Sequence, residues 1–197
     1  MKGELELVPE QLIRCFIAVN LPDKIRVEIK SYLSELMRLT SAVKWVRVEN
    51  IHLTLKFLGE IEADKVKLIE DKLADIGNVF SPFELSIAGS GCFPGRKNPR
   101  VFWLGLEQGI ENPLFSLHQW IEKQLSPLGF AIEKRRFSPH LTLGRVKNQE
   151  DFSDLYTFLD QQPFKKTIFR ADKLSFMQSV LKPTGAVYSV IHEYFFR

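Results

Sequence analysis

Two of the four histidines in this 197-residue chain open the same four-residue motif, His-Leu-Thr-Leu, which begins once at His52 and again at His140. Imidazole titrates near neutral pH, so of two histidines in one site one can accept a proton while the other donates one. If the two motifs meet in space, the sequence predicts general acid–base catalysis that needs no metal.

The threonine of each motif adds a hydroxyl group to the same face. Side chains alternate between the two faces of a strand, so His52 points the same way as Thr54, and His140 the same way as Thr142. A hydroxyl donor is useful where negative charge must be held, as on a phosphate passing through a pentacovalent state. Neither motif contains a Ser or Cys nucleophile, so phosphodiester chemistry fits better than amide chemistry. The opposite faces are expected to carry the apolar residues Leu53, Leu55, Phe57, Leu141 and Leu143.

Two other interpretations of the repeated motif stay open. The histidines could bind a metal ion, but neither motif supplies a carboxylate or a further histidine at ligand spacing, so no metal is expected. They could also be structural histidines in two unrelated strands. The catalytic interpretation requires that the two strands bring both histidine faces into one groove, as two pseudo-symmetric lobes would do.

The elements that must position these residues alternate along the chain. Apolar periodicity predicts four helices, one that begins near residue 23 and three that cover 63–76, 113–128 and 152–159. The buried side of the first is expected to carry Ile25, Ile29, Leu33, Leu36 and Met37. That of the third is expected to carry Leu114, Leu117, Ile121 and Leu125. Short apolar or alternating runs predict strands at 14–19, 43–46, 51–59, 83–91, 101–106, 140–146, 173–181 and 186–196. No Ser/Gly linker separates the halves. We therefore expect two similar α+β lobes packed as one compact domain over residues 1–197.

Composition narrows the class of protein. A mass of 22.8 kDa with 45% hydrophobic and 26% charged residues is typical of one globular domain. No apolar run reaches the roughly 18 residues of a membrane span, and residues 1–11 do not resemble a signal peptide, so a cytoplasmic protein is expected. Cys15 and Cys92 lie in apolar contexts and are predicted to be reduced, mostly buried thiols. A net charge of +3 does not identify a nucleic-acid binder, although positive charge gathers at 96–100 and 134–136.

Longer segments carry a family resemblance. They are RCFIAVNLP, VKWVRVENIHLTLKFLGEI, RVFWLGL, FSPHLTLGRV and LSFMQSVLKPTGAVYSVI, and they extend over almost the whole chain from Arg14. Together they resemble the RNA 2′,3′-cyclic phosphodiesterase family, also called the bacterial and archaeal 2′-5′ RNA ligases, within the two-histidine phosphoesterase superfamily. Both H-x-T-x motifs of that superfamily are intact here. Residues 1–11 lie outside the resemblance.

The resemblance implies an α+β fold in which two pseudo-symmetric lobes, each an antiparallel sheet with flanking helices, enclose a central cleft. It implies hydrolysis of an RNA 2′,3′-cyclic phosphate end to a 2′-phosphate without metal or cofactor, with RNA ends or small cyclic nucleotides as partners and a monomeric protein. His52 would be the proton donor and His140 the proton acceptor, while Thr54 and Thr142 hold the phosphoryl oxygens. The order of donor and acceptor rests on the resemblance alone. The reverse reaction would join the cyclic end to a 5′-hydroxyl as a 2′-5′ linkage.

Four basic residues near the motifs are candidate phosphate contacts. Lys56 continues the histidine face by alternation and could reach a phosphate. Arg145 lies on the opposite parity, yet a twist or bulge at the strand end could turn it toward the cleft. Arg135 and Arg136 precede the second motif and are candidates for contacts to the RNA backbone. For each of the four, a solvated surface position is the competing explanation.

Aromatic side chains could stack on a base beside the cyclic phosphate, and Phe93, Phe137 and Trp45 are the candidates. The chain has 16 phenylalanines, so any one of them could equally belong to the core. The remaining histidines, His118 and His192, are expected to be structural or exposed.

Two alternative functions stay open at this point. A module that binds RNA ends without turnover would bind a cyclic end tightly and release no product. An enzyme of the same superfamily could instead act on 2′-5′ oligonucleotides or cyclic nucleotides, since the motifs are shared across the superfamily.

Overall fold

The computed structural model describes residues 12–107, 113–183 and 185–197. Its helices are α1 Asp23–Leu39, α2 Lys65–Leu73, α3 Ile76–Val79, α4 Pro113–Leu125 and α5 Ser153–Gln161, with short 3₁₀ turns η1 Val48–Asn50 and η2 Ser126–Leu128. Its strands are β1 Leu12–Asn20, β2 Val43–Trp45, β3 His52–Glu62, β4 Phe83–Phe93, β5 Val101–Leu106, β6 His140–Val146, β7 Thr167–Ala171, β8 Lys173–Lys182 and β9 Gly185–Phe195.

The helices follow the predicted apolar stripes. Four of the five residues predicted to lie on the buried side of α1 are buried, and the four predicted for α4 are fully buried. Met37 is the exception, because it lies at the margin of the α1 stripe and is 57% exposed. The predicted helix over 63–76 is divided into α2 and the short α3.

The described strands form one nine-stranded antiparallel sheet in the order β7-β4-β5-β6-β3-β1-β8-β9, with β2 paired to β6 beside that path. The α+β class with an antiparallel sheet and flanking helices is confirmed. The strand β7 was not predicted, because its five residues lack a clear alternation. A single registered pair, Leu53 with Leu141, joins β3 to β6 and so connects the two halves of the sheet. Two pseudo-symmetric lobes around a cleft, in one compact domain, stay a prediction.

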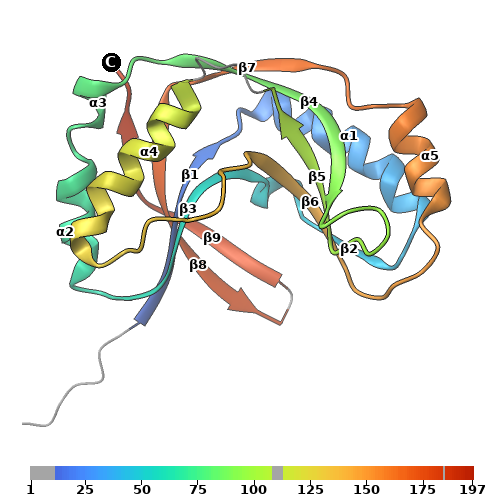
Figure 1. Ribbon diagram of the computed structural model, residues 1–197, viewed down its shortest axis with the longest axis horizontal. Coiled ribbons are helices and arrows are strands. Elements are labelled where there is room, and N and C mark those ends of the chain that lie inside the picture. The colour runs from blue at the N-terminus through green and yellow to red at the C-terminus, as the bar shows by residue number, and fades with distance from the viewer. Residues whose placement is uncertain (1–11, 108–112, 184) are drawn as a thin grey trace, which may run out of the picture.

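The sheet curls, and helices lie at both of its ends (Figure 1). The helices α2 and α4 contact each other at one end, while α1 and α5 contact each other at the other. Their apolar sides share one hydrophobic core with the sheet. None of the helices in the described part of the chain is long and apolar enough to cross a membrane.

A β-bulge interrupts the first repeat of the motif. The register of β3 against β1 shifts by one residue at Leu55. Beyond a bulge, side chains lie on the face opposite to the one that simple alternation predicts. Lys56 is accordingly 7% exposed and Phe57 is 67% exposed. The predictions that Lys56 continues the histidine face and that Phe57 joins the buried face are therefore wrong.

The second repeat has the same bulge. The register of β6 against β5 shifts at Leu143, and the six residues that start at each histidine show the same sequence of partly exposed, buried and exposed side chains. Arg145 thereby takes the place in β6 that Phe57 has in β3, with its side chain exposed. The predicted bulge or twist at this strand end is present.

Candidate active site

The pairing of Leu53 with Leu141 fixes the positions of four polar side chains. Both leucines are fully buried on one face of the sheet. Along each strand the histidine and the threonine flank this leucine, so they point to the other face. The antiparallel register places His52 across from Thr142, and Thr54 across from His140. We call these four side chains the His–Thr quartet; its two histidines lie on one diagonal.

Both histidine rings are held in the same way. Nδ1 of His52 lies 2.8 Å from the carbonyl oxygen of Asn50, and Nδ1 of His140 lies 2.8 Å from the carbonyl oxygen of Ser138. A carbonyl oxygen can only accept, so Nδ1 must carry the proton in each ring. The Nε2 atom of each neutral ring is then left as the proton acceptor. The backbone carbonyl two residues before each histidine thus fixes the tautomer that proton transfer needs.

Aromatic rings surround His52. Its ring stacks on Phe16 with centroids 4.6 Å apart, and it meets the edge of Tyr188 at 5.2 Å. Phe16 belongs to a small second apolar cluster on this side of the sheet. Burial lowers the pKa of His52 from 6.5 to about 4, the bond to Asn50 opposes this, and the positive charge of Arg26 adds to it. His52 is therefore neutral in the free protein near pH 7.

This low pKa predicts a loss of stability in acid. Between pH 6.5 and 4 the unfolded chain protonates His52 while the native protein does not, so the free energy of unfolding falls as the pH falls through this window. We expect His52→Gln to remove up to about 3 kcal/mol of the acid-induced loss. Thermal unfolding of both proteins at pH 7 and pH 4 measures the difference. Equal losses in the two proteins would contradict the lowered pKa of His52.

Two adjoining cavities meet at the His–Thr quartet. The larger, about 860 Å³, is lined by His140 and the smaller, about 460 Å³, by His52 and Thr142. Thr54 and Phe57 line both. The quartet thus lies at the junction of the two cavities, which together we call the cleft.

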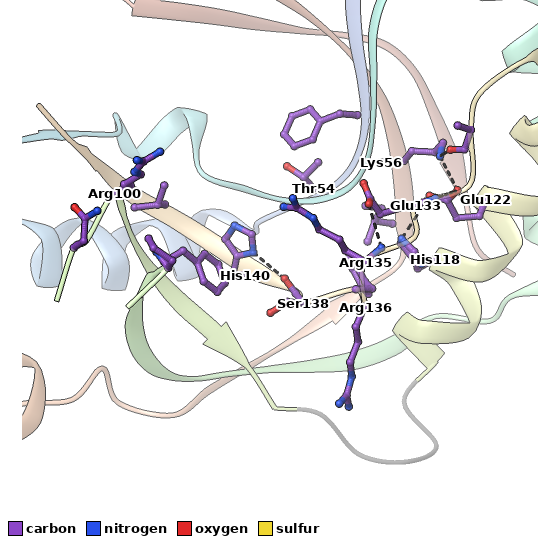
Figure 2. A pocket seen from close by; sticks show the side chains of 18 residues that line it. Thr54, Lys56, Arg100, His118, Glu122, Glu133, Arg135, Arg136, Ser138 and His140 are labelled. Atoms are coloured by element: carbon purple, nitrogen blue, oxygen red, sulfur yellow. Dashed lines mark hydrogen bonds and ion pairs between the residues drawn. The ribbon is translucent and has the colours of Figure 1, made fainter. Parts of the chain in front are cut away.

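Positive charge lines both cavities. Arg145 lies in the smaller one beside His52 and Thr142. Arg100, Arg135 and Arg136 line the larger one. In Figure 2 the Arg135 side chain reaches over toward Thr54 and His140, whereas the Arg136 side chain points away from them. The cleft therefore suits a ligand that has one negative group at the quartet and further negative groups in the two cavities.

Lys56 and Phe137 also line the larger cavity, but both side chains are engaged by other residues. The ammonium group of Lys56 is paired with Glu122, not free toward the quartet. Phe137 stacks on His118 with centroids 4.0 Å apart, so one of its faces is already covered. Trp45 packs near Phe102 and lines neither cavity.

Phe93 and the remaining histidines lie as follows. The Phe93 ring meets the edge of His140 at 5.1 Å and lines the larger cavity, so this candidate is beside the quartet. His118 is buried on α4 at the wall of the larger cavity, and His192 is half-exposed near Glu70. Cys15 and Cys92 carry free thiols, the first buried and the second partly buried.

Arg100, Phe16 and Tyr188 line the cleft and were not among the predicted site residues. Arg100 was noted only as part of a basic cluster, and its place beside the larger cavity follows from the turn between β4 and β5. Phe16 and Tyr188 come from strands far apart in the chain, so no local pattern links them to His52. Across the described ranges, no group of three or more His, Cys, Asp or Glu side chains gathers as metal ligands would.

Comparison with known proteins gives consistent matches. The family described as LigT like Phosphoesterase matches residues 19–103 and again residues 104–188, one copy of the motif in each. The RNA 2′,3′-cyclic phosphodiesterase of Archaeoglobus fulgidus is 38% identical over 177 residues, which cover 89% of this chain and 96% of the relative. The RNA 2′,3′-cyclic phosphodiesterase of Thermotoga maritima is 34% identical over 182 residues, 92% of this chain and 94% of the relative.

Solved structures share the fold. TT0787 of Thermus thermophilus superposes with a TM-score of 0.78 at 24% identity, covering 94% of this chain and 98% of that one. LigT of E. coli in complex with 3′-AMP superposes with a TM-score of 0.77 at 24% identity, covering 94% and 99%.

Proposed function

The chain belongs to the LigT-like phosphoesterase family, and from this we propose that it hydrolyses the 2′,3′-cyclic phosphate at an RNA end to a 2′-phosphate. The observation that carries the proposal is the His–Thr quartet, in which two imidazoles and two hydroxyls from one chain share one face of the sheet. The names of the relatives support the choice of substrate. Because a single chain supplies the whole quartet, we propose that the protein acts as a monomer. We propose the cytoplasm as the place where it acts.

The proposed reaction is one in-line displacement at phosphorus. Nε2 of His140 accepts a proton from water as the water oxygen bonds to phosphorus, and the bond from phosphorus to O3′ breaks. His52 gives its Nε2 proton to the departing O3′. The hydroxyls of Thr54 and Thr142 donate to the non-bridging oxygens, where charge grows in the transition state. Arg145, in the same cavity as His52, adds positive charge.

The donor role of His52 needs a bound anion. In the free protein burial keeps the pKa of this imidazole at about 4, so it holds no proton at pH 7 on Nε2. A phosphodiester beside it places negative charge next to the ring and favours the protonated form. We propose that substrate binding itself charges His52. The two rings are held alike, so the assignment of donor and acceptor continues to rest on the family.

The two cavities suggest how an RNA end would lie. The terminal ribose would lie at the quartet with its O3′ toward His52. The chain that precedes it would occupy the larger cavity, where Arg100 and Arg135 can meet phosphates and Phe93 can contact a base. The smaller cavity lies beyond the quartet. A 5′-hydroxyl that takes the place of the water beside His140 would displace O3′ in the same way and give 2′-5′ ligation, although hydrolysis dominates in dilute aqueous solution.

Hydrolysis of an RNA oligonucleotide with a 2′,3′-cyclic phosphate end tests the proposal. We expect turnover to a product that carries only a 2′-phosphate, at a rate that EDTA leaves unchanged because imidazoles carry the protons. Chromatography against 2′- and 3′-phosphate standards identifies the product. A 2′-5′-linked dinucleotide and a cyclic mononucleotide serve as comparison substrates.

Other outcomes would select the alternatives. Tight binding of the cyclic end without any product would indicate a module that recognises RNA ends. Faster turnover of the 2′-5′ dinucleotide or of the cyclic mononucleotide would indicate another phosphodiester as the substrate. A 3′-phosphate product would contradict the proposed displacement of O3′.

A further inference from the structure

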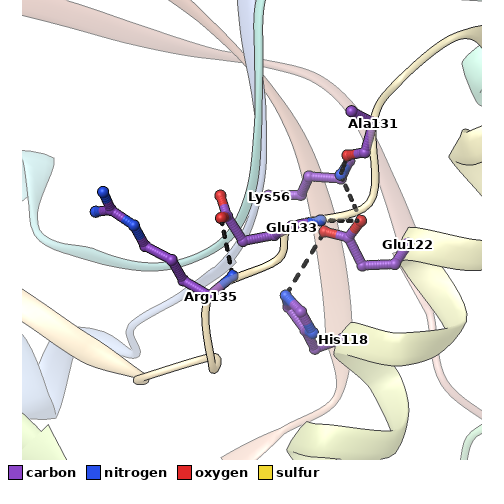
Figure 3. A network of polar contacts seen from close by, with 6 residues as sticks. All are labelled: Lys56, His118, Glu122, Ala131, Glu133 and Arg135. Atoms are coloured by element: carbon purple, nitrogen blue, oxygen red, sulfur yellow. Dashed lines mark hydrogen bonds and ion pairs between the residues drawn. The ribbon is translucent and has the colours of Figure 1, made fainter.

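A buried ion pair lies beside the larger cavity (Figure 3). The Nζ atom of Lys56 is 2.6 Å from Oε2 of Glu122, and the two side chains are 6% and 7% exposed. Lys56 stands on β3 just beyond the first motif, and Glu122 stands on α4. Removing two charges from water is costly, and a well-packed apolar pair often stabilises a core as well or better. Stability alone therefore does not account for this pair.

Both members of the pair also bond to the segment that leads to the second motif. We call residues 130–139, between η2 and β6, the arginine segment. Nζ of Lys56 donates to the carbonyl oxygen of Ala131 at 2.9 Å, and Oε2 of Glu122 accepts from the backbone N–H of Glu133 at 3.2 Å. Among the described residues, no backbone group of the arginine segment bonds to another backbone group. The backbone of this segment is bonded by side chains and not by other backbone groups.

Further contacts extend the hold along the segment. Phe137 stacks on His118, and Nε2 of His118 lies 3.7 Å from the second carboxylate oxygen of Glu122. The backbone N–H of Arg135 donates to Oε1 of Glu133 at 3.2 Å. Glu122 is thus the centre of a network that reaches both ends of the segment.

The arginine segment carries the positive side of the larger cavity. Arg135 and Arg136 line this cavity, and in Figure 2 Arg135 reaches toward the quartet. The ring of His140 bonds to Ser138 at the end of the segment, but its backbone is fixed by the pairing of β6 with β5. The bonds of Lys56 and Glu122 hold the segment nearer its start, at Ala131 and Glu133. A looser segment would therefore displace the arginines more than the imidazole.

We propose that Lys56 and Glu122 are positioning residues that hold the arginine segment so that Arg135 and Arg136 meet the phosphates of the bound RNA. The inference rests on the proposed function, because it assigns the larger cavity to RNA. It predicts that the pair affects binding of the RNA and not the chemical step.

The double variant Lys56→Met/Glu122→Leu tests this inference. It keeps apolar volume in the core and removes both bonds to the segment, so we expect a folded protein. KM for the cyclic-ended oligonucleotide should rise about tenfold, with kcat changed by less than about threefold, because phosphate contacts weaken while the quartet is intact. The matched control is Lys173→Met/Glu193→Leu, which removes a partly buried ion pair that lines neither cavity. The control should leave KM unchanged.

A double-mutant cycle shows whether the pair acts through the arginines. In a protein that already carries Arg135→Ala and Arg136→Ala, removal of the ion pair should not raise KM further, since the effects of residues that act through one another do not add. An unchanged KM in the pair variant would overturn the inference. A full tenfold rise that persists without the arginines would overturn it as well.

A second variant covers the case in which the apolar pair does not fold. The variant Lys56→Met/Glu122→Gln keeps an acceptor for the N–H of Glu133, so it should raise KM less than the variant with two apolar residues does. If this variant folds and its KM equals that of the wild type, the inference is overturned. Binding of a fluorescent cyclic-ended oligonucleotide separates the two proposals. If the wild type forms no product, the proposed function fails, and the same tenfold change in Kd still tests the positioning role.

Discussion

Replacement of His52 or His140 by alanine should lower kcat/KM for a cyclic-ended RNA by about a hundred- to ten-thousand-fold. Each variant loses one of the two proton transfers, to O3′ or from water. Both rings are only partly buried and lie on the cleft face, away from the core leucines, so the fold should persist. Initial rates of 2′-phosphate formation, with thermal unfolding of each variant, give the measurement.

The double variant and a third histidine supply the controls. The two imidazoles serve one displacement, so the double variant should lose far less than the product of the two single losses. His192→Ala removes a half-exposed imidazole outside both cavities and should leave the rate unchanged. Single variants at His52 and His140 that match the wild type would refute the acid–base pair and return the motifs to a structural role.

The sequence predicts which face of its strand each motif residue occupies, but it does not predict the β-bulges. Alternation placed each histidine and threonine on one face, opposite the leucines, because only neighbours along a strand are needed for that inference. The bulge at Leu55 cannot be recognised from the sequence, since the stretch continues to alternate through Phe57. In the second stretch only Arg145 departs from the alternation. Lys56 and Phe57 were consequently assigned to the wrong faces, while Arg145 was anticipated only because a bulge was considered.

Contacts between distant segments could not be predicted. Apolar periodicity gives the buried side of α1 or α4 but not the element that covers it. The pairing of β3 with β6, the ring contacts of Phe16 and Tyr188 with His52, and the ion pair of Lys56 with Glu122 each join residues far apart in the chain. The family resemblance implied that the motifs meet; the register of Leu53 with Leu141 supplies the physical reason.

The second large effect is expected from removal of the quartet hydroxyls. Thr54→Val and Thr142→Val keep the β-branched shape that suits a strand and delete only the hydroxyl donor. Loss of one donor to a developing phosphoryl charge should lower kcat about a hundredfold, with a smaller change in KM, since the bond strengthens in the transition state. Steady-state rates on the cyclic-ended oligonucleotide measure both constants.

Serine at the same positions decides what the hydroxyls do. Thr54→Ser and Thr142→Ser lose a methyl group but keep the donor, so each should retain most of the wild-type kcat while the matched valine variant does not. Threonines that serve only as strand formers would give the reverse order, because valine favours a strand more than serine does. Each threonine lies across from the histidine of the other strand, so the loss should be of similar size at the two positions. A large loss at only one of them would show that the phosphoryl group is held from one strand.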